Sequence, residues 1–153
     1  MGGDGKVKAF LDTNVVVDFC AQREPYFKNA LAIMDMGFRK EITKIVSALT
    51  LVNTVYVLRK VVAKELILKK VERLMDLCDV SPINYWVMRK SVYSGRKDFE
   101  DAVQYYSANF ANADVIVTRD KSGFCDLDVL VQTPEEFIDF CDRENLKDIN
   151  NNK

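Results

Sequence analysis

The sequence predicts an α/β protein, a three-layer α/β/α sandwich with a central parallel sheet. Short apolar segments of strand length alternate along the chain with longer segments whose apolar residues recur at helical spacing. This alternation is typical of parallel strands that are covered by helices on both faces. The length of 153 residues and a hydrophobic fraction of 48% fit one globular domain with its own core.

The first part of the chain opens with the apolar segment Lys6–Leu11, which we expect to be a buried strand. Residues Asn14–Cys20 follow as a short helix. A longer helix is expected over Pro25–Gly37, since proline suits a first helical turn and glycine suits a C-terminal cap. The segment Glu41–Val46 is β-branched and apolar, and it predicts a second strand.

The middle of the chain is expected to be mainly helical. Ser47 can cap a helix that runs to about Arg59, and a further helix covers about Ala63–Leu77. A short strand over Asp79–Ser81 ends at a proline. The next helix covers Asn84–Ser94, where a glycine breaks the pattern.

The last part predicts a helix over Phe99–Asn109, entered at an aspartate, and then strands at Asp114–Thr118 and Val129–Val131. Thr133 is followed by proline and two glutamates, which is the usual order of residues at a helix start. We expect this final helix to end near Asn145.

We therefore divide the chain into a disordered N-terminal segment at residues 1–5, one domain at 6–145 and a polar tail at 146–153. No apolar run reaches the length of a membrane span, so we expect no membrane association. The four cysteines have wide, irregular spacing, which favours reduced thiols and a cytoplasmic location over a zinc site.

The chain contains no histidine. This excludes the serine–histidine and cysteine–histidine nucleophilic systems, and it removes the commonest zinc ligand. If the protein is an enzyme, we expect its chemistry to run on carboxylates, which bind hard cations such as Mg²⁺ or Mn²⁺. The net charge of −1 predicts no global attraction to nucleic acid, so RNA binding would need a local patch or bound metal.

Four aspartates occupy positions where a parallel sheet can gather side chains. Asp12 follows the first strand and Asp120 follows the fourth, so both should emerge at the carboxyl edge of the sheet. Asp98 and Asp101 lie three residues apart and share one helix face. Asp18, six residues beyond Asp12, is a weaker candidate.

Each acid also has a structural interpretation. Asp98 can serve only as the N-cap of its helix, and Asp101 can serve only to interact favourably with the helix dipole in the first turn. Asp12 is harder to explain in this way, because a carboxylate at the end of an apolar strand is costly without a partner. A divalent cation would relieve the repulsion among clustered carboxylates and would activate water for phosphodiester hydrolysis.

Three segments resemble the acidic motifs of PIN domains: the opening FLDTNVVVD at residues 10–18, DFEDA at 98–102 and VTRDKSGF at 117–124. The resemblance covers nearly the whole chain. It implies a Mg²⁺- or Mn²⁺-dependent endoribonuclease. In this enzyme Asp12, Asp101 and Asp120 would bind the metal, and Asp98 would be an additional acid beside them. It also implies supporting roles for Thr13, Asn14, Asn53 and Thr118.

One position departs from the family pattern. Asn53 stands where the resemblance leads us to expect a glutamate on the helix after the second strand. An amide oxygen can bind a hard cation but brings no charge. The alternative is therefore a catalytically weak or inactive PIN scaffold that binds RNA or a protein partner. A haloacid-dehalogenase phosphatase is less compatible, since the residue two after Asp12 is Asn14 rather than an acid.

Basic side chains flank the acids in sequence and could contact RNA phosphates: Arg96, Lys97, Arg119 and Lys121. They could equally belong to an ordinary solvated face. The resemblance to small stand-alone PIN proteins further implies the toxin of a VapBC-type pair, with an antitoxin as partner and a homodimer as the assembly.

Overall fold

The computed structural model describes residues 6–36 and 42–151. Its sheet has five strands in the order β3-β2-β1-β4-β5, and every neighbouring pair is parallel. The strands are β1 (Val7–Leu11), β2 (Ile42–Ser47), β3 (Asp79–Ser81), β4 (Val115–Val117) and β5 (Leu130–Gln132).

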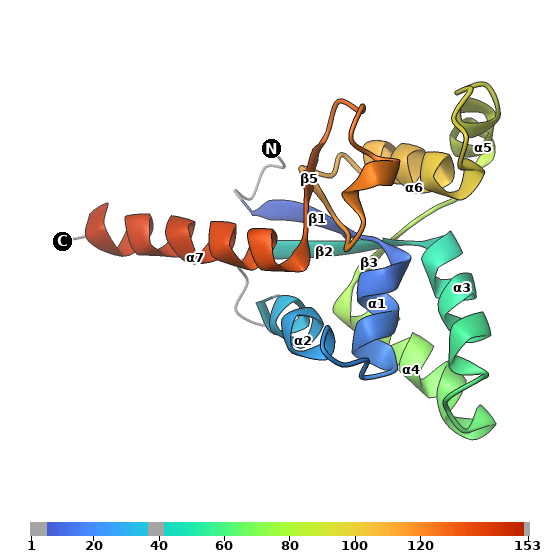
Figure 1. Cartoon of the computed structure of the whole chain (residues 1–153), viewed down its shortest axis with the longest axis horizontal. Coiled ribbons are helices and arrows are strands. Elements are labelled where there is room, and N and C mark those ends of the chain that lie inside the picture. The colour runs from blue at the N-terminus through green and yellow to red at the C-terminus, as the bar shows by residue number, and fades with distance from the viewer. Residues whose placement is uncertain (1–5, 37–41, 152–153) are drawn as a thin grey trace.

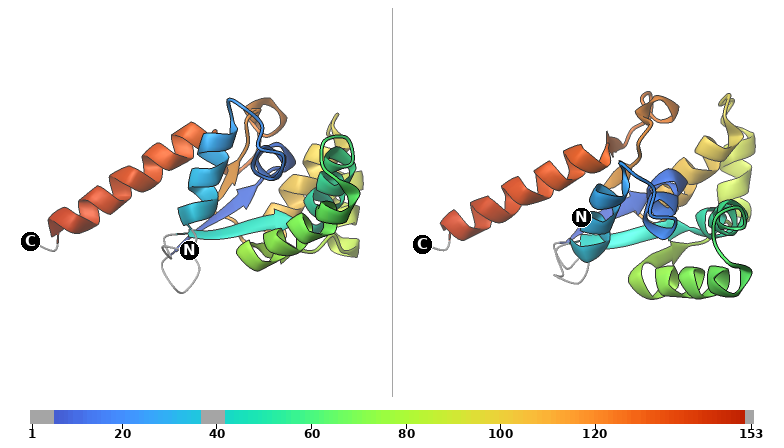
Figure 2. Two further views of the ribbon diagram at one scale, coloured as in Figure 1. Left: turned by 90° about the horizontal axis from the view of Figure 1, so that it is seen from below. Right: turned by 60° about the horizontal axis from the view of Figure 1, so that its bottom comes forward.

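The described residues form seven α-helices and one 3₁₀ helix, arranged on the two faces of the sheet (Figures 1 and 2). This confirms the predicted three-layer α/β/α sandwich. The helices are α1 (Thr13–Cys20), α2 (Phe27–Met36), α3 (Ala48–Leu58), α4 (Lys64–Leu77), α5 (Tyr85–Val92), α6 (Phe99–Phe110), η1 (Lys121–Gly123) and α7 (Pro134–Asn151).

The core lies on both faces of the sheet because neighbouring residues of a strand point to opposite sides. Ala9 and Leu11 of β1 are fully buried in a cluster with residues of α1, α2, α4 and α7. Phe10, between them, is buried on the other face with Ala108 of α6 and Phe124. A strand that is buried on both faces explains why this segment is continuously apolar.

The chain order of the strands creates a crevice beside β1. From β1 the chain moves to β2 and β3 on one side, and it later returns to β4 and β5 on the other. In open α/β sheets, ligands bind at such a reversal of strand order, beyond the carboxyl ends of the strands. Asp12 follows β1 and Thr118 follows β4, so both side chains lie at this point.

Several helix ends differ from the sequence-based expectation, and α2 and α7 illustrate why. The amides of Tyr26 and Phe27 donate to the Arg23 carbonyl, which closes a turn before the helix, so α2 begins at Phe27 rather than Pro25. The expected cap at Gly37 lies outside the described residues, as do the expected disordered segment at 1–5 and the strand residue Glu41. At the other end, α7 continues past the expected limit to Asn151 and extends away from the sheet (Figure 2).

Across residues 6–36 and 42–151, no helix combines the length and the apolar character that crossing a membrane requires.

Candidate active site

The Asp12 carboxylate is held in place by hydrogen bonds from the surrounding protein. It caps helix α1, and each carboxylate oxygen accepts two hydrogen bonds. Oδ1 accepts from the Thr13 amide at 2.8 Å and from Gln104 Nε2 at 3.2 Å. Oδ2 accepts from Thr118 Oγ1 at 2.8 Å and from Asn14 Nδ2 at 3.4 Å. Donors from four separate positions hold this carboxylate in one orientation.

Gln104 connects Asp12 to the end of β2 and was missed by the sequence reasoning. Its side chain is buried, with Nε2 donating to Thr50 Oγ1 at 2.8 Å as well as to Asp12. Its Oε1 accepts from Ser47 Oγ. A usable signal existed, because Gln104 follows Asp101 by three residues and therefore shares its helix face.

The start of α6 brings three further acids toward Asp12. Asp98 caps the helix by accepting a hydrogen bond from the Asp101 amide at 3.1 Å. Asp98, Glu100, Asp101 and Asp12 all line one pocket of about 330 Å³. The structure thus brings Asp12, Asp98 and Asp101 together, and it adds Glu100, which we had not named as a site residue.

These carboxylates disturb one another's protonation. Burial raises the pKa of the Asp101 carboxyl to about 6, and the charges of Asp98, Asp12, Glu100 and Asp120 add to the rise. Burial also raises the pKa of Glu100, with further increases from Asp12 and Asp98. The charged form of Asp101 is therefore penalised in the metal-free protein, as expected for acids forced together.

Asp120 lies at the side of this group. It is exposed and is not among the residues that line the pocket, although its charge acts on Asp101. Its Oδ1 accepts hydrogen bonds from the amide and hydroxyl of Ser122, which lower the pKa of Asp120. The same loop brings Gly123 against Asp101 so closely that a methyl group at residue 123 would overlap the Asp101 carboxylate.

The four acids that line this pocket offer carboxylate oxygens, which are the ligands that a hard cation prefers. Within the described parts of the chain, however, no three acids are placed to hold one ion as they stand. Binding would have to draw at least one carboxylate inward. Repulsion among the acids is the physical reason for their separation without a cation.

Asn53 faces this group from α3. Its Nδ2 donates to Glu100 Oε1 at 2.8 Å, so the position where we expected a glutamate instead contacts a glutamate of α6. Thr13 and Thr50 join α1 to α3 through their hydroxyl oxygens, which lie 3.0 Å apart.

Arg119 contacts two residues outside the acid pocket, Asp18 and Tyr26. Its Nε donates to the buried carboxylate of Asp18 at 2.7 Å, and its guanidinium lies 3.9 Å from the centre of the Tyr26 ring. Its amide donates to Asn14 Oδ1 at 3.2 Å, which ties the loop after β4 to the loop after β1. Burial raises the pKa of Asp18, while Arg119 and Arg23 oppose the rise. Asp18 therefore positions Arg119 and does not line the pocket.

The other basic candidates also lie near this edge. Arg96 pairs with Asp126 at 3.0 Å and donates to the Gly123 carbonyl, so it holds the loop that packs on Asp101. Lys121 pairs with Glu136 at 2.8 Å. Lys97 is exposed. A role for these side chains in binding RNA stays a prediction.

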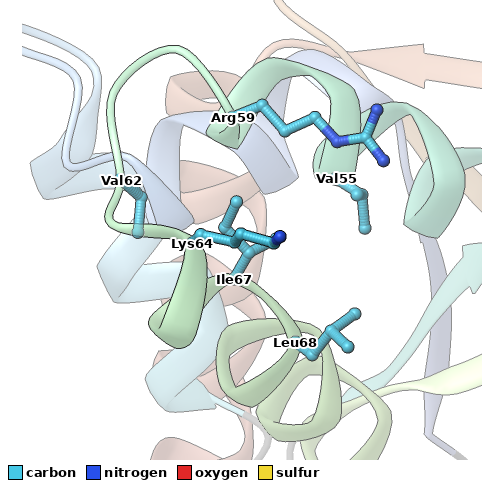
Figure 3. A pocket seen from close by; sticks show the side chains of 6 residues that line it. All are labelled: Val55, Arg59, Val62, Lys64, Ile67 and Leu68. Atoms are coloured by element: carbon cyan, nitrogen blue, oxygen red, sulfur yellow. The ribbon is translucent and has the colours of Figure 1, made fainter.

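A second, larger pocket of about 530 Å³ lies between α3 and α4 (Figure 3). Val55, Ile67 and Leu68 surround its open space, with Arg59 and Lys64 as its charged side chains. It contains no acid and therefore offers no ligand for a hard cation. Ile67 is buried at its base, whereas Leu68 is 72% exposed, and an exposed apolar side chain beside a pocket suits a protein-binding surface.

Comparison with known proteins agrees with this fold. A curated relative from Aquifex aeolicus, "Ribonuclease VapC1", is 27% identical over 143 residues, covering 90% of this chain and 96% of the relative. The structure of DNA-bound VapBC from Salmonella typhimurium aligns with a TM-score of 0.63 at 18% identity, over 84% of this chain and 98% of that one. A toxin–antitoxin complex from Klebsiella pneumoniae aligns with a TM-score of 0.61 at 18% identity, over 82% and 97%.

The family model of the PIN domain matches residues 8–122, which contain all of the acids of the site. These residues make up most of the described sheet and its helices. The chain belongs to the PIN domain family.

Proposed function

We propose that the protein is an endoribonuclease that depends on Mg²⁺ or Mn²⁺ and hydrolyses RNA phosphodiesters. The main support is the pocket in which Asp12, held by four donors, faces the acids of α6. Family membership and the name of the Aquifex relative agree with this proposal. The lack of histidine agrees as well, because hydrolysis by a metal-bound water needs no protein nucleophile.

We assign Asp12, Asp101 and Asp120 to hold the cation and Asp98 to add charge beside them. A bound divalent cation would supply a Lewis acid and a water of lowered pKa at this edge of the sheet. Thr13, Asn14 and Thr118 orient Asp12 by donating hydrogen bonds to it.

RNA would approach along the edge that carries the basic residues. Lys97 and Lys121 are exposed and can contact phosphates directly, whereas Arg96 and Arg119 also position loops of the site. Asn53 favours the competing proposal of an inactive scaffold, because it leaves α3 without an acid at this position. That scaffold would bind RNA without cutting it.

For partners, we propose the toxin role in a VapBC-type pair, in the cytoplasm, with an antitoxin bound and the toxin as a homodimer. The support is likeness to the toxin–antitoxin complex and VapBC structures, together with the exposed apolar pocket between α3 and α4. Co-purification with the product of the adjoining reading frame tests the pair. Leu68→Glu should abolish that co-purification while cleavage of RNA persists. Light scattering tests the homodimer.

Cleavage of single-stranded and structured RNA tests the enzymatic proposal. Wild type should cut in Mg²⁺ or Mn²⁺ and stop in EDTA. Asp12→Asn should lose at least about 100-fold in rate, because the site loses its central charge. RNA that is bound but never cut by the wild type, with either metal, would support the inactive scaffold and reject the enzyme.

A further inference from the structure

The contact between Asn53 and Glu100 joins two helices that border the site. Asn53 lies on α3 and Glu100 lies in the first turn of α6, 47 positions later in the sequence. The bond of 2.8 Å involves only Oε1 of Glu100. The donor is a neutral amide, so the contact orients the carboxylate without neutralising its charge.

Glu100 also borders the acid pocket itself. It lines the same space of about 330 Å³ as Asp12, Asp98 and Asp101. An exposed glutamate in a first helical turn gains from the helix dipole in any orientation toward solvent. An amide that fixes one oxygen beside three other acids has no such general explanation, since it holds like charges near one another.

We propose that Glu100 supplies the carboxylate that α3 lacks, with Asn53 as the positioning residue that holds it at the metal site. This inference rests on the proposed metal-dependent nuclease and adds a fourth metal-binding acid to it. The assignment makes the pair a unit: the amide sets the orientation and the carboxylate brings the charge. With Asn53 in place of the expected glutamate, the acid of the site comes from α6 instead of α3, and the number of acids is unchanged.

A second Asn–Glu pair in the same molecule provides a control. Asn29 Nδ2 donates to Glu135 Oε1, also at 2.8 Å, where α7 begins. Glu135 is not among the residues that line the acid pocket. The two pairs therefore share chemistry and bond length but differ in their relation to the site.

Calorimetric titration of the full chain with Mn²⁺ distinguishes a metal ligand from a surface contact. Glu100→Gln keeps an oxygen that can accept from Asn53 and removes only the charge. It should weaken Mn²⁺ binding by about tenfold, in the range typical for groups that support a metal site. Glu135→Gln should leave Mn²⁺ affinity unchanged, and thermal unfolding in EDTA should show that both variants are folded.

The positioning role of Asn53 is tested by a double-mutant cycle. Asn53→Ala should weaken Mn²⁺ binding by about threefold, because Glu100 loses its orientation. Adding Asn53→Ala to Glu100→Gln should cause no further loss. Additive losses would overturn the assignment of Asn53 as a residue that acts through Glu100.

Asp12→Asn separates this inference from the proposed function. If Asp12→Asn loses Mn²⁺ binding and Glu100→Gln binds like wild type, Glu100 is no ligand and the inference is wrong while the metal site stands. If wild type itself binds no Mn²⁺, both the inference and the proposed metal-dependent nuclease are wrong.

Discussion

The two sides of the acid pocket are built in opposite ways. At the strand side, both oxygens of Asp12 accept hydrogen bonds, and the donors are themselves held by the ends of β2 and β4. At the helix side, no described residue donates a hydrogen bond to the Asp101 carboxylate, and neighbouring acids raise its pKa to about 6.

This difference shows which part of the site is complete without a cation. The strand side satisfies the charge of the half-buried Asp12 through hydrogen bonds from the protein, so its geometry is fixed in advance. The helix side carries charges that the protein does not neutralise, so it gains most from a bound cation. We therefore expect variants of the residues that hold Asp12 to affect stability, and variants of the acids on the helix side to affect metal binding and catalysis without a loss of metal-free stability.

The largest expected effect comes from Asp101→Asn, on the helix side. The rate of RNA cleavage in Mg²⁺ should fall by about 100-fold or more, because a metal-binding charge is lost. In EDTA at neutral pH the same variant should unfold at a higher temperature than wild type, since repulsion is relieved. A loss of both activity and metal-free stability would contradict the contrast between the two sides.

A variant of a residue that holds Asp12 should show the reverse pattern, even though Gln104 itself lies on α6. Gln104→Met removes the donor and acceptor that join Asp12, Thr50 and Ser47, so each of these three groups loses one hydrogen bond. We expect the free energy of unfolding to fall by about 2 kcal/mol in chemical denaturation. Gln132→Met is the matched control and should cost little, because Gln132 Oε1 is buried without a hydrogen-bond partner.

The loop that joins the two sides provides a smaller effect. In Gly123→Ala, the new methyl group would overlap the Asp101 carboxylate and push it aside. Cleavage should slow by about tenfold, since small displacements of reacting groups are costly. The same substitution in an Asp101→Ala background should have almost no effect on the rate. Equal effects in both backgrounds would show that Gly123 acts elsewhere.

The smallest effect is the pH dependence of metal-free stability. The pKa of Asp101 is raised in the folded state, so the folded protein holds this proton more tightly than the unfolded chain does. The resulting stability is present below the ordinary pKa and is lost as the pH rises through about 6. Melting temperatures in EDTA should therefore fall by a few degrees from about pH 4 to about pH 7. Asp101→Asn should flatten this dependence.

The positions of Asp12, Asp98 and Asp101 can be predicted from the sequence for physical reasons. Asp12 ends an apolar strand, and the parallel sheet brings the ends of β1 and β4 to one edge. Asp98 and Asp101 share a face of α6 because they are three residues apart. Local patterns and the sheet topology are sufficient for these residues.

Other features depend on contacts between distant segments, which local patterns do not encode. The bond from Asn53 to Glu100 requires the packing of α3 against the start of α6. The pairing of Arg119 with Asp18 explains both charges as parts of one buried contact, although each had seemed a candidate for ligand binding. The extension of α7 to Asn151 was missed because its last residues are mostly polar, with only Leu146 and Ile149 apolar among residues 145–151.

The most direct test of the two-sided metal site is a crystal structure of the protein soaked in Mn²⁺, with anomalous differences collected from the manganese. The account predicts a peak between Asp12 and Asp101, with the α6 carboxylates drawn toward it and Asp12 unmoved. Manganese bound only outside this pocket, or an occupied pocket in which Asp12 makes no contact with the ion, would contradict the account.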